Sequence, residues 1–252
     1  MTFLRKERKL RILSHSQIST YETCPWQWYA SKVLRLPAPS SNPEFAEGRA
    51  VHAALASYWL GNANWQEVLK ANLDWEFEKV EPQPIPSFSL QTKANILDHI
   101  QERDEHLINS LCEAIKKQYK GAVKTIEMER KWEIPGFVGV VDWRGMLNGV
   151  EHILDWKTSN RPYSEEKVHT DTQLTCYAAL TGIRHVGYGV MIKSEGSVQF
   201  LTSARTKDEC DAYWTKVEQI RKEMDSGVAK PCEGYHCNWC AFANRCPAKG
   251  DF

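Results

Sequence analysis

Two turn signals in the middle of the chain restrict its fold more than any other feature. Pro135-Gly136 and Asn148-Gly149 are dipeptides that favour tight hairpins. They separate three short segments with strand character, at 123–134, 137–147 and 151–157. Because strands joined by such short turns pair with their neighbours in antiparallel fashion, the sequence predicts an antiparallel meander.

Helical periodicity precedes this meander and returns after it. The helices expected before the meander cover 14–23, 47–60, 64–80 and 91–120, with three prolines between residues 82 and 86 as an interruption. The elements expected after it are a helix at 170–181, strands at 185–193 and 197–204, and a helix from 206 to 227. This order predicts one α/β domain with a helical N-terminal portion.

The character of the sequence divides the chain into four parts. We expect a charged tail at 1–13, a helical portion at 14–120 and a sheet-forming core at 121–228. Half of the eight cysteines lie in the fourth part, a tail at 229–252 that has little periodicity.

Composition and charge exclude several classes of protein. Hydrophobic residues make up 42% of the 252, enough for a folded core. The formal net charge is zero, so contact with nucleic acid requires a local basic channel. No apolar stretch is long enough to span a membrane and no apolar leader follows Met1, so we expect a cytoplasmic protein. In that compartment, clustered cysteines more often bind metal than form disulfides.

Two carboxylates and a lysine fall in neighbouring strands. Asp142 lies in the segment GVVDWRG, and Asp155 and Lys157 share one face of the next strand, ILDWKTS. Hairpin pairing would bring Asp142 and Asp155 together, where they repel each other unless a cation neutralises them. Oxygen ligands suit Mg²⁺ or Mn²⁺, and Lys157 can position an attacking water or stabilise charge on a phosphate. A surface salt bridge is the more frequent explanation of an isolated Asp-x-Lys sequence.

Three further residues accompany this pair in a fixed order. His52 lies near the start of an expected helix, and Gln173 and Tyr177 lie on one face of the helix that follows the Asp-x-Lys strand. Alone, His52 is more often a core or surface histidine than a ligand. Likewise, Gln173 and Tyr177 alone are ordinary positions of an amphipathic helix.

The ordered segments GRAVH, GVVDWRG, ILDWKTS and QLTCYAAL resemble the RecB-like nucleases of the PD-(D/E)xK superfamily, which include AddAB nuclease domains and CRISPR adaptation nucleases. The resemblance covers residues 14–246 and implies a mixed central sheet flanked by helices, with 121–228 as the nuclease core. It implies that the metal ligands are His52, Asp142, Asp155 and the Trp156 carbonyl, that Lys157 is catalytic, and that Gln173 and Tyr177 contact the substrate. Glu129 is an outer acidic group or, more simply, keeps its strand soluble.

The cysteines of the tail suggest a second metal centre. Cys237, Cys240 and Cys246 form a C-x2-C-x5-C pattern, one ligand short of a tetrahedral set. The candidates for the fourth ligand are Cys24, Cys112, Cys176, Cys210 and Cys232. Cys24, followed by proline, resembles the upstream cysteine of the iron–sulfur nucleases in the same family, which implies a 4Fe-4S cluster that joins the N-terminal helix to the tail.

Two alternatives to this cluster assignment stay open. Structural zinc is the main one, because C-x2-C alone is more often a zinc pattern. Cys232 is a second candidate for the fourth ligand, whereas Cys112, Cys176 and Cys210 lie in predicted helices and are expected to be packing residues.

The sequence as a whole predicts a metal-dependent deoxyribonuclease, an exonuclease that acts on single-stranded or frayed DNA ends. Any unwinding would need a helicase, recombination or adaptation partner protein. The alternative is a non-catalytic iron–sulfur or zinc subunit that binds DNA or acts as a scaffold in a repair or recombination complex. The candidate base-stacking residues are Trp26, Trp28 and Tyr29, and the candidate DNA-backbone contacts are Arg49, Arg161, Lys167 and Arg184. Core packing and solvated surface charge are the respective alternatives.

Overall fold

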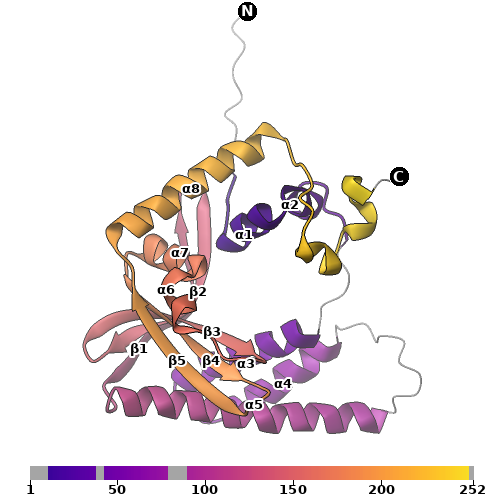
Figure 1. Cartoon of the computed structure of the whole chain (residues 1–252). Coiled ribbons are helices and arrows are strands. Elements are labelled where there is room, and N and C mark those ends of the chain that lie inside the picture. Colours follow the sequence, from indigo (N-terminus) through magenta and orange to yellow (C-terminus); the bar gives the residue numbers. More distant parts are fainter. Residues whose placement is uncertain (1–10, 38–42, 79–89, 250–252) are drawn as a thin grey trace, which may run out of the picture. The chain divides into compact units, whose positions relative to one another are not determined.

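A computed structural model describes residues 11–37, 43–78 and 90–249 (Figure 1). The expected charged tail, apart from residues 11–13, lies outside these ranges, as do the three prolines between 82 and 86. Within the described ranges, no helix combines the length and the apolar character needed to cross a membrane.

The described elements follow the expected order of helices, meander, helix, strands, helix and tail. They are α1 (His15–Thr23), α2 (Pro25–Lys32), α3 (Pro43–Trp59), α4 (Trp65–Glu78), α5 (Leu90–Gln118), β1 (Val123–Ile134), β2 (Phe137–Leu147), β3 (Val150–Ser159), α6 (Glu165–Thr170), α7 (Thr172–Thr181), β4 (His185–Ile192), β5 (Ser197–Ala204), α8 (Lys207–Ser226) and the 3-10 helices η1 (Tyr235–Trp239), η2 (Ala243–Arg245) and η3 (Pro247–Lys249).

The five strands form one sheet in the order β1-β2-β3-β4-β5. Strands β2 and β3 pair antiparallel, β3 and β4 pair parallel, and β4 and β5 pair antiparallel. This mixed sheet flanked by helices confirms the predicted fold class. Asn148 and Gly149 both have positive φ, 49° and 77°, between β2 and β3. Two consecutive left-handed residues are what a type I′ hairpin needs, which is why the Asn-Gly dipeptide predicts this turn correctly.

Two short helices are absent from the sequence-based expectation. Helix α2 begins at Pro25, where we expected only the end of the preceding helix. Proline fits the first turn of a helix because the N–H that it lacks has no partner there in any case. Helix α6 has only six residues and is therefore too short to show a period. Helix α3 begins at Pro43, four residues before the predicted start.

The chain forms two compact units that alternate along the sequence. The described residues of the first unit are 11–37, 131–140 and 212–249, and those of the second are 43–78, 90–130 and 141–211. The four consecutive parts expected from the sequence remain a prediction.

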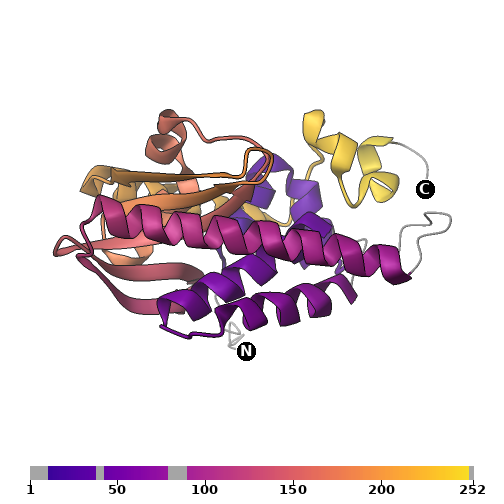
Figure 2. The same cartoon turned by 90° about the horizontal axis from the view of Figure 1, so that it is seen from below.

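The second unit has its hydrophobic core between helix α5 and one face of the sheet. Helix α5 lies across strands β4 and β5 (Figure 2), and it buries Leu107 and Leu111 against Trp156 of β3. Gly189 pairs with Trp156 in the parallel ladder, and a Cβ added to this glycine would lie 2.6 Å from the indole ring. Only glycine therefore fits beside the tryptophan that anchors β3 in the core.

The first unit contains α1, α2, the part of α8 from Ala212 onward and the cysteine-rich tail. The buried guanidinium of Arg221 in α8 donates hydrogen bonds to the backbone carbonyls of Arg11 and Gly136. Phe137 packs against Tyr213 and Trp214 of the same helix. These contacts fix α8 to the segment that precedes α1 and to the turn before β2.

Candidate active site

The polar residues of the candidate active site come from the face of β3 opposite to the core. Leu154 and Trp156 are fully buried in the α5 core, so the intervening Asp155 and the following Lys157 lie on the other face. Asp155 is 1% exposed, and its Oδ2 lies 2.6 Å from the Lys157 ammonium. The predicted Asp-x-Lys pair therefore forms a buried ion pair, not a surface salt bridge.

Asp142 joins this pair from strand β2. The antiparallel register pairs Trp143 with Leu154, so one step further along the strands Asp142 lies opposite Asp155. The backbone N–H of Trp156 donates a 2.8 Å hydrogen bond to Oδ2 of Asp142. Hairpin pairing thus brings the two carboxylates together.

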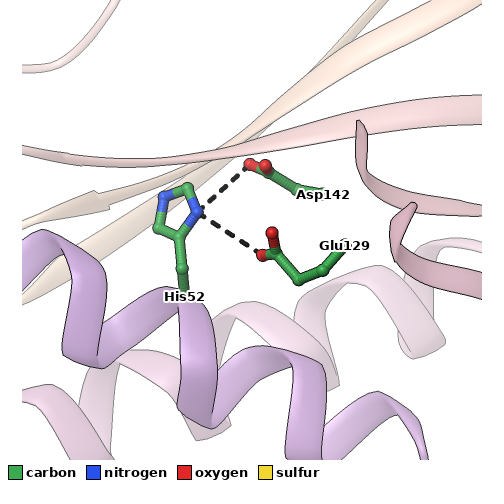
Figure 3. Close-up of side chains that lie close together, drawn as sticks. All are labelled: His52, Glu129 and Asp142. Carbon is green, nitrogen blue, oxygen red and sulfur yellow. Dashed lines mark ion pairs between the residues drawn. The ribbon is translucent and has the colours of Figure 1, made fainter. Parts of the chain in front are cut away.

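His52 and Glu129 lie close to Asp142, and His52 is within ion-pair distance of both carboxylates (Figure 3). Nδ1 of His52, on helix α3, is 3.4 Å from Oδ2 of Asp142 and 3.8 Å from Oε1 of Glu129. One ligand atom from each of the three residues lies within 4.8 Å of the other two. The two carboxylates of this group supply the oxygen ligands that Mg²⁺ and Mn²⁺ prefer.

The backbone of Glu129 has a left-handed conformation, with φ at +48° inside strand β1. The in–out alternation of the strand breaks at the two preceding residues, both of which are half-buried. A left-handed residue other than glycine costs about 1–2 kcal/mol, and such outliers gather at functional sites. The sequence-based preference for a solubility role at Glu129 does not account for this placement. Nothing in the sequence marks the change of backbone conformation.

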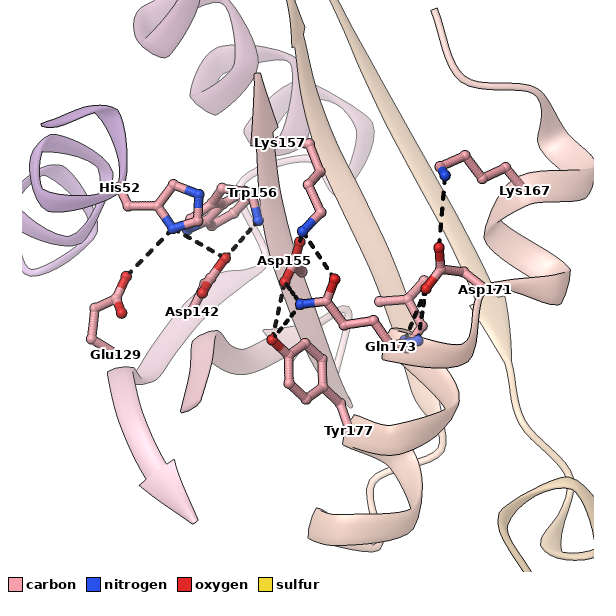
Figure 4. A network of polar contacts seen from close by, with 11 residues as sticks. His52, Glu129, Asp142, Asp155, Trp156, Lys157, Lys167, Asp171, Gln173 and Tyr177 are labelled. Atoms are coloured by element: carbon pink, nitrogen blue, oxygen red, sulfur yellow. Dashed lines mark hydrogen bonds and ion pairs between the residues drawn. The ribbon is translucent and has the colours of Figure 1, made fainter. Parts of the chain in front are cut away.

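Helix α7 adds two side chains to the site (Figure 4). Gln173 Nε2 donates to Oδ1 of Asp155 at 2.9 Å and to the Tyr177 hydroxyl at 2.8 Å, while its carbonyl oxygen accepts from Lys157 at 3.0 Å. The Tyr177 hydroxyl donates to the same Oδ1 of Asp155. Asp171 caps the helix by accepting from the backbone N–H of Gln173, and this cap fixes where the helix begins.

Asp155 and Glu129 bind protons more tightly than ordinary carboxylates do. Burial and the charge of Asp142 raise the pKa of Asp155 to about 6 and that of Glu129 to about 7. Burial alone would lower the pKa of His52, but its hydrogen bond with Asp142 and the nearby carboxylates raise it to about 9. A divalent cation can displace these protons, because ligation requires ionised carboxylates and a neutral imidazole.

A groove with a volume of about 630 Å³ opens beside these residues. Its lining includes His52, Glu129, Lys157, Arg49 and Phe45. Arg49 also forms an ion pair with Glu76 at 2.7 Å, so its guanidinium is partly neutralised. The groove therefore gives solvent and substrate access to the half-buried His52 and Lys157.

The other residues predicted to contact DNA lie in different surroundings. Arg161, Lys167 and Arg184 are exposed, and Lys167 approaches Asp171 at 3.8 Å. Trp28 is 1% exposed and packs edge-on against Tyr21, so its proposed stacking role is wrong and core packing explains it. Trp26 and Tyr29 are half-buried.

The first unit contains a separate cavity of about 230 Å³ that is lined by cysteines. The lining thiols are those of Cys24, Cys232, Cys237, Cys240 and Cys246. Cys24 is held between α1 and α2, where it caps both helices, and its sulfur accepts a hydrogen bond from the N–H of Cys232 at 3.4 Å. The other three cysteines, Cys112, Cys176 and Cys210, lie in helices as expected.

Comparison with known proteins gives one extensive match. The family model described as the PD-(D/E)XK nuclease superfamily matches residues 12–247. No curated protein matches the chain significantly.

Three solved structures resemble the chain remotely. SSO0001 is 16% identical over 81% of this chain and 86% of that chain, with a TM-score of 0.38. LHK-Exo in complex with dAMP is 13% identical over 73% of this chain and 93% of that chain, with a TM-score of 0.32. The alkaline exonuclease LHK-Exo from Laribacter hongkongensis is 12% identical over 73% of this chain and 97% of that chain, with a TM-score of 0.27. Likenesses this remote carry no argument about the present chain.

Proposed function

Since the chain belongs to the PD-(D/E)XK nuclease superfamily, we propose that it is a divalent-metal-dependent deoxyribonuclease that acts as an exonuclease on single-stranded or frayed DNA ends. The observation that carries this proposal is a chain of contacts between residues of α3, β2 and β3. His52 contacts Asp142, Asp142 accepts from the backbone N–H next to Asp155, and Asp155 pairs with Lys157. A structural salt bridge does not need a histidine, two buried carboxylates and a lysine beside an open groove.

The donor set fits a hard divalent cation. His52, Glu129 and Asp142 each offer one atom to a common position, and Asp155 adds a buried carboxylate whose Oδ2 lies 2.6 Å from the Lys157 ammonium. We assign the metal to His52, Asp142 and Asp155, with the Trp156 carbonyl as a further ligand. When bound, Mg²⁺ or Mn²⁺ stabilises negative charge at the scissile phosphate and lowers the pKa of an attacking water.

Lys157 supplies a positive charge for phosphodiester cleavage, and Asp155 and Gln173 hold its ammonium in position. Burial alone would lower its pKa, but Asp155 raises it, so the ammonium keeps its proton. It can therefore donate hydrogen bonds to the attacked phosphate and stabilise the charge that develops there. Gln173 and Tyr177 hold Asp155 in place through hydrogen bonds to its Oδ1. We also assign to them the contact with the nucleotide at the cut.

Glu129 gives a direct test of the metal assignment. Glu129→Gln should weaken Mn²⁺ binding by about 10- to 100-fold, the usual effect of losing an outer partner of a metal site. Titration calorimetry with Mn²⁺ measures this without requiring activity. Glu133→Gln is the matched control, since Glu133 lies on the same strand and pairs with Lys131 instead. An unchanged dissociation constant in Glu129→Gln would remove Glu129 from the site.

Metal dependence and substrate choice test the function itself. Purified protein should degrade end-labelled single-stranded DNA with Mg²⁺ or Mn²⁺, should stop in EDTA, and should not respond to Ca²⁺. Circular single strands should resist an enzyme that needs ends. Cleavage that survives exhaustive chelation would contradict the metal-dependent mechanism, and complete inactivity on all DNA would favour the non-catalytic scaffold.

We further propose that the chain is of the RecB-like branch and carries a 4Fe-4S cluster. Cys24, Cys237, Cys240 and Cys246 would hold it, since all four line one cavity. The cluster would have a structural role and would fix the tail at 229–252 to the N-terminal helix. A helicase or recombination partner would supply any unwinding.

A further inference from the structure

Two aromatic side chains of the cysteine-rich tail stay outside the core. Tyr235 is 79% exposed and Trp239 is 62% exposed, both on the 3-10 helix η1. Their ring centroids lie 4.4 Å apart in an edge-to-face arrangement. Two large rings in solvent lose the stabilisation that burial would provide. Exposed apolar side chains of this kind often mark a surface that binds a ligand or partner.

The two rings border a groove with a volume of about 380 Å³. Its other lining residues are Ser19, Thr20, Thr23, Gln27 and His236. This is more than ten times the roughly 30 Å³ share of a water molecule, so the groove has room for a planar heterocycle. All seven lining residues belong to the first unit.

The lining chemistry fits a nucleobase rather than a phosphate. None of the described lining residues is Lys, Arg, Asp or Glu, and the His236 ring is engaged with the carbonyl of Cys232 at 2.9 Å. The hydroxyls of Thr20 and Thr23 donate to backbone carbonyls one turn earlier, which leaves their oxygens free to accept from base amino groups. Aromatic faces beside neutral hydrogen-bonding groups are the means by which proteins stack single-stranded bases without regard to sequence.

We propose that Tyr235 and Trp239, with the polar groove beside them, form a base-stacking subsite for single-stranded DNA. This inference rests on the proposed nuclease function and specifies part of its substrate recognition. It places the stacking platform on η1 rather than on the buried Trp28.

The test is the affinity of the full chain, purified without oxygen, for a fluorescein-labelled oligothymidylate in Ca²⁺, measured by anisotropy. Tyr235→Leu and Trp239→Leu keep apolar bulk but remove the ring, and each should weaken binding by about tenfold or more. Trp239→Phe should restore most of the affinity. The loss should depend little on salt, because no phosphate contact is removed. Trp75→Leu is the matched control, an exposed tryptophan on helix α4.

Two further measurements separate this proposal from the nuclease function. Hydrolysis of bis(p-nitrophenyl) phosphate, which has no base to stack, should be the same in the Leu variants and the parent. Iron content shows whether Trp239→Leu disturbs the neighbouring cysteines. If the iron content falls, the DNA affinity of Tyr235→Leu is the measurement that tests the stacking subsite. Parental DNA affinity in Tyr235→Leu would overturn the stacking subsite, would point to a protein partner for the two rings, and would leave the nuclease function standing.

Discussion

Lys157→Ala should lower the rate of DNA cleavage by about three orders of magnitude. The Lys157 ammonium lies 2.6 Å from Oδ2 of Asp155 and donates to Gln173, so it is held beside the proposed metal ligand Asp155. Because the metal ligands are other residues, Mn²⁺ binding should persist. Single-turnover cleavage of end-labelled DNA, together with Mn²⁺ titration, measures both effects.

Two further variants test whether the loss is specific to the active site. Lys124→Ala, at an exposed lysine of strand β1, should cleave at the parental rate. Asp155→Asn should also lose cleavage, and its melting temperature reports the balance between relieved repulsion from Asp142 and the loss of the Lys157 counter-charge. A melting curve of Lys157→Ala is needed as well, because that change leaves a buried carboxylate without its cation. Parental cleavage by Lys157→Ala would show that the active site has been assigned wrongly.

The parts of this site that follow from short-range rules could be predicted from the sequence. Strand alternation places Asp155 and Lys157 on one face, and the Asn148-Gly149 turn sets the register that brings Asp142 opposite Asp155. Helix geometry places Gln173 and Tyr177 one turn apart, and in the structure they share a hydrogen bond. Each of these relations depends on a period or a turn that a few consecutive residues determine.

The parts that depend on contacts between distant segments could not be predicted in this way. Glu129 lies near His52 and Asp142 because its own backbone is left-handed. Glutamate rarely adopts this conformation, and no neighbouring residue in the sequence predicts it. The aromatic residues show the same limit: Trp28 is buried and Trp239 is exposed, although both lie next to polar residues in the sequence. Burial of a large ring depends on what the rest of the chain packs against it.

Cys24→Ala should remove the cluster and lower the melting temperature by about 10 °C. Cys24 is 5% exposed and lies at the junction of α1 and α2, while its expected partners lie in a tail whose described residues, up to 249, form only short 3-10 helices. A link between segments roughly 200 positions apart restricts the unfolded chain strongly, by about 5.4 kcal/mol in the loop-entropy estimate. The measurements are iron content, visible absorbance and a melting curve on protein purified without oxygen, in which the parent should hold about four irons per chain.

Cys112→Ala is the matched control for this change. Cys112 is fully buried in helix α5, and burial raises the pKa of its thiol well above the ordinary value, so it should be an unreactive packing residue. Its loss should cost about 1 kcal/mol and leave the colour unchanged. Brown protein from Cys24→Ala would instead make Cys232 the fourth ligand, because Cys232 lines the same cavity and its N–H already contacts the Cys24 sulfur. Stoichiometric zinc without iron in the parent would overturn the cluster but not the nuclease, because none of the cysteines that line the cavity is among the residues assigned to the metal at His52, Asp142 and Asp155.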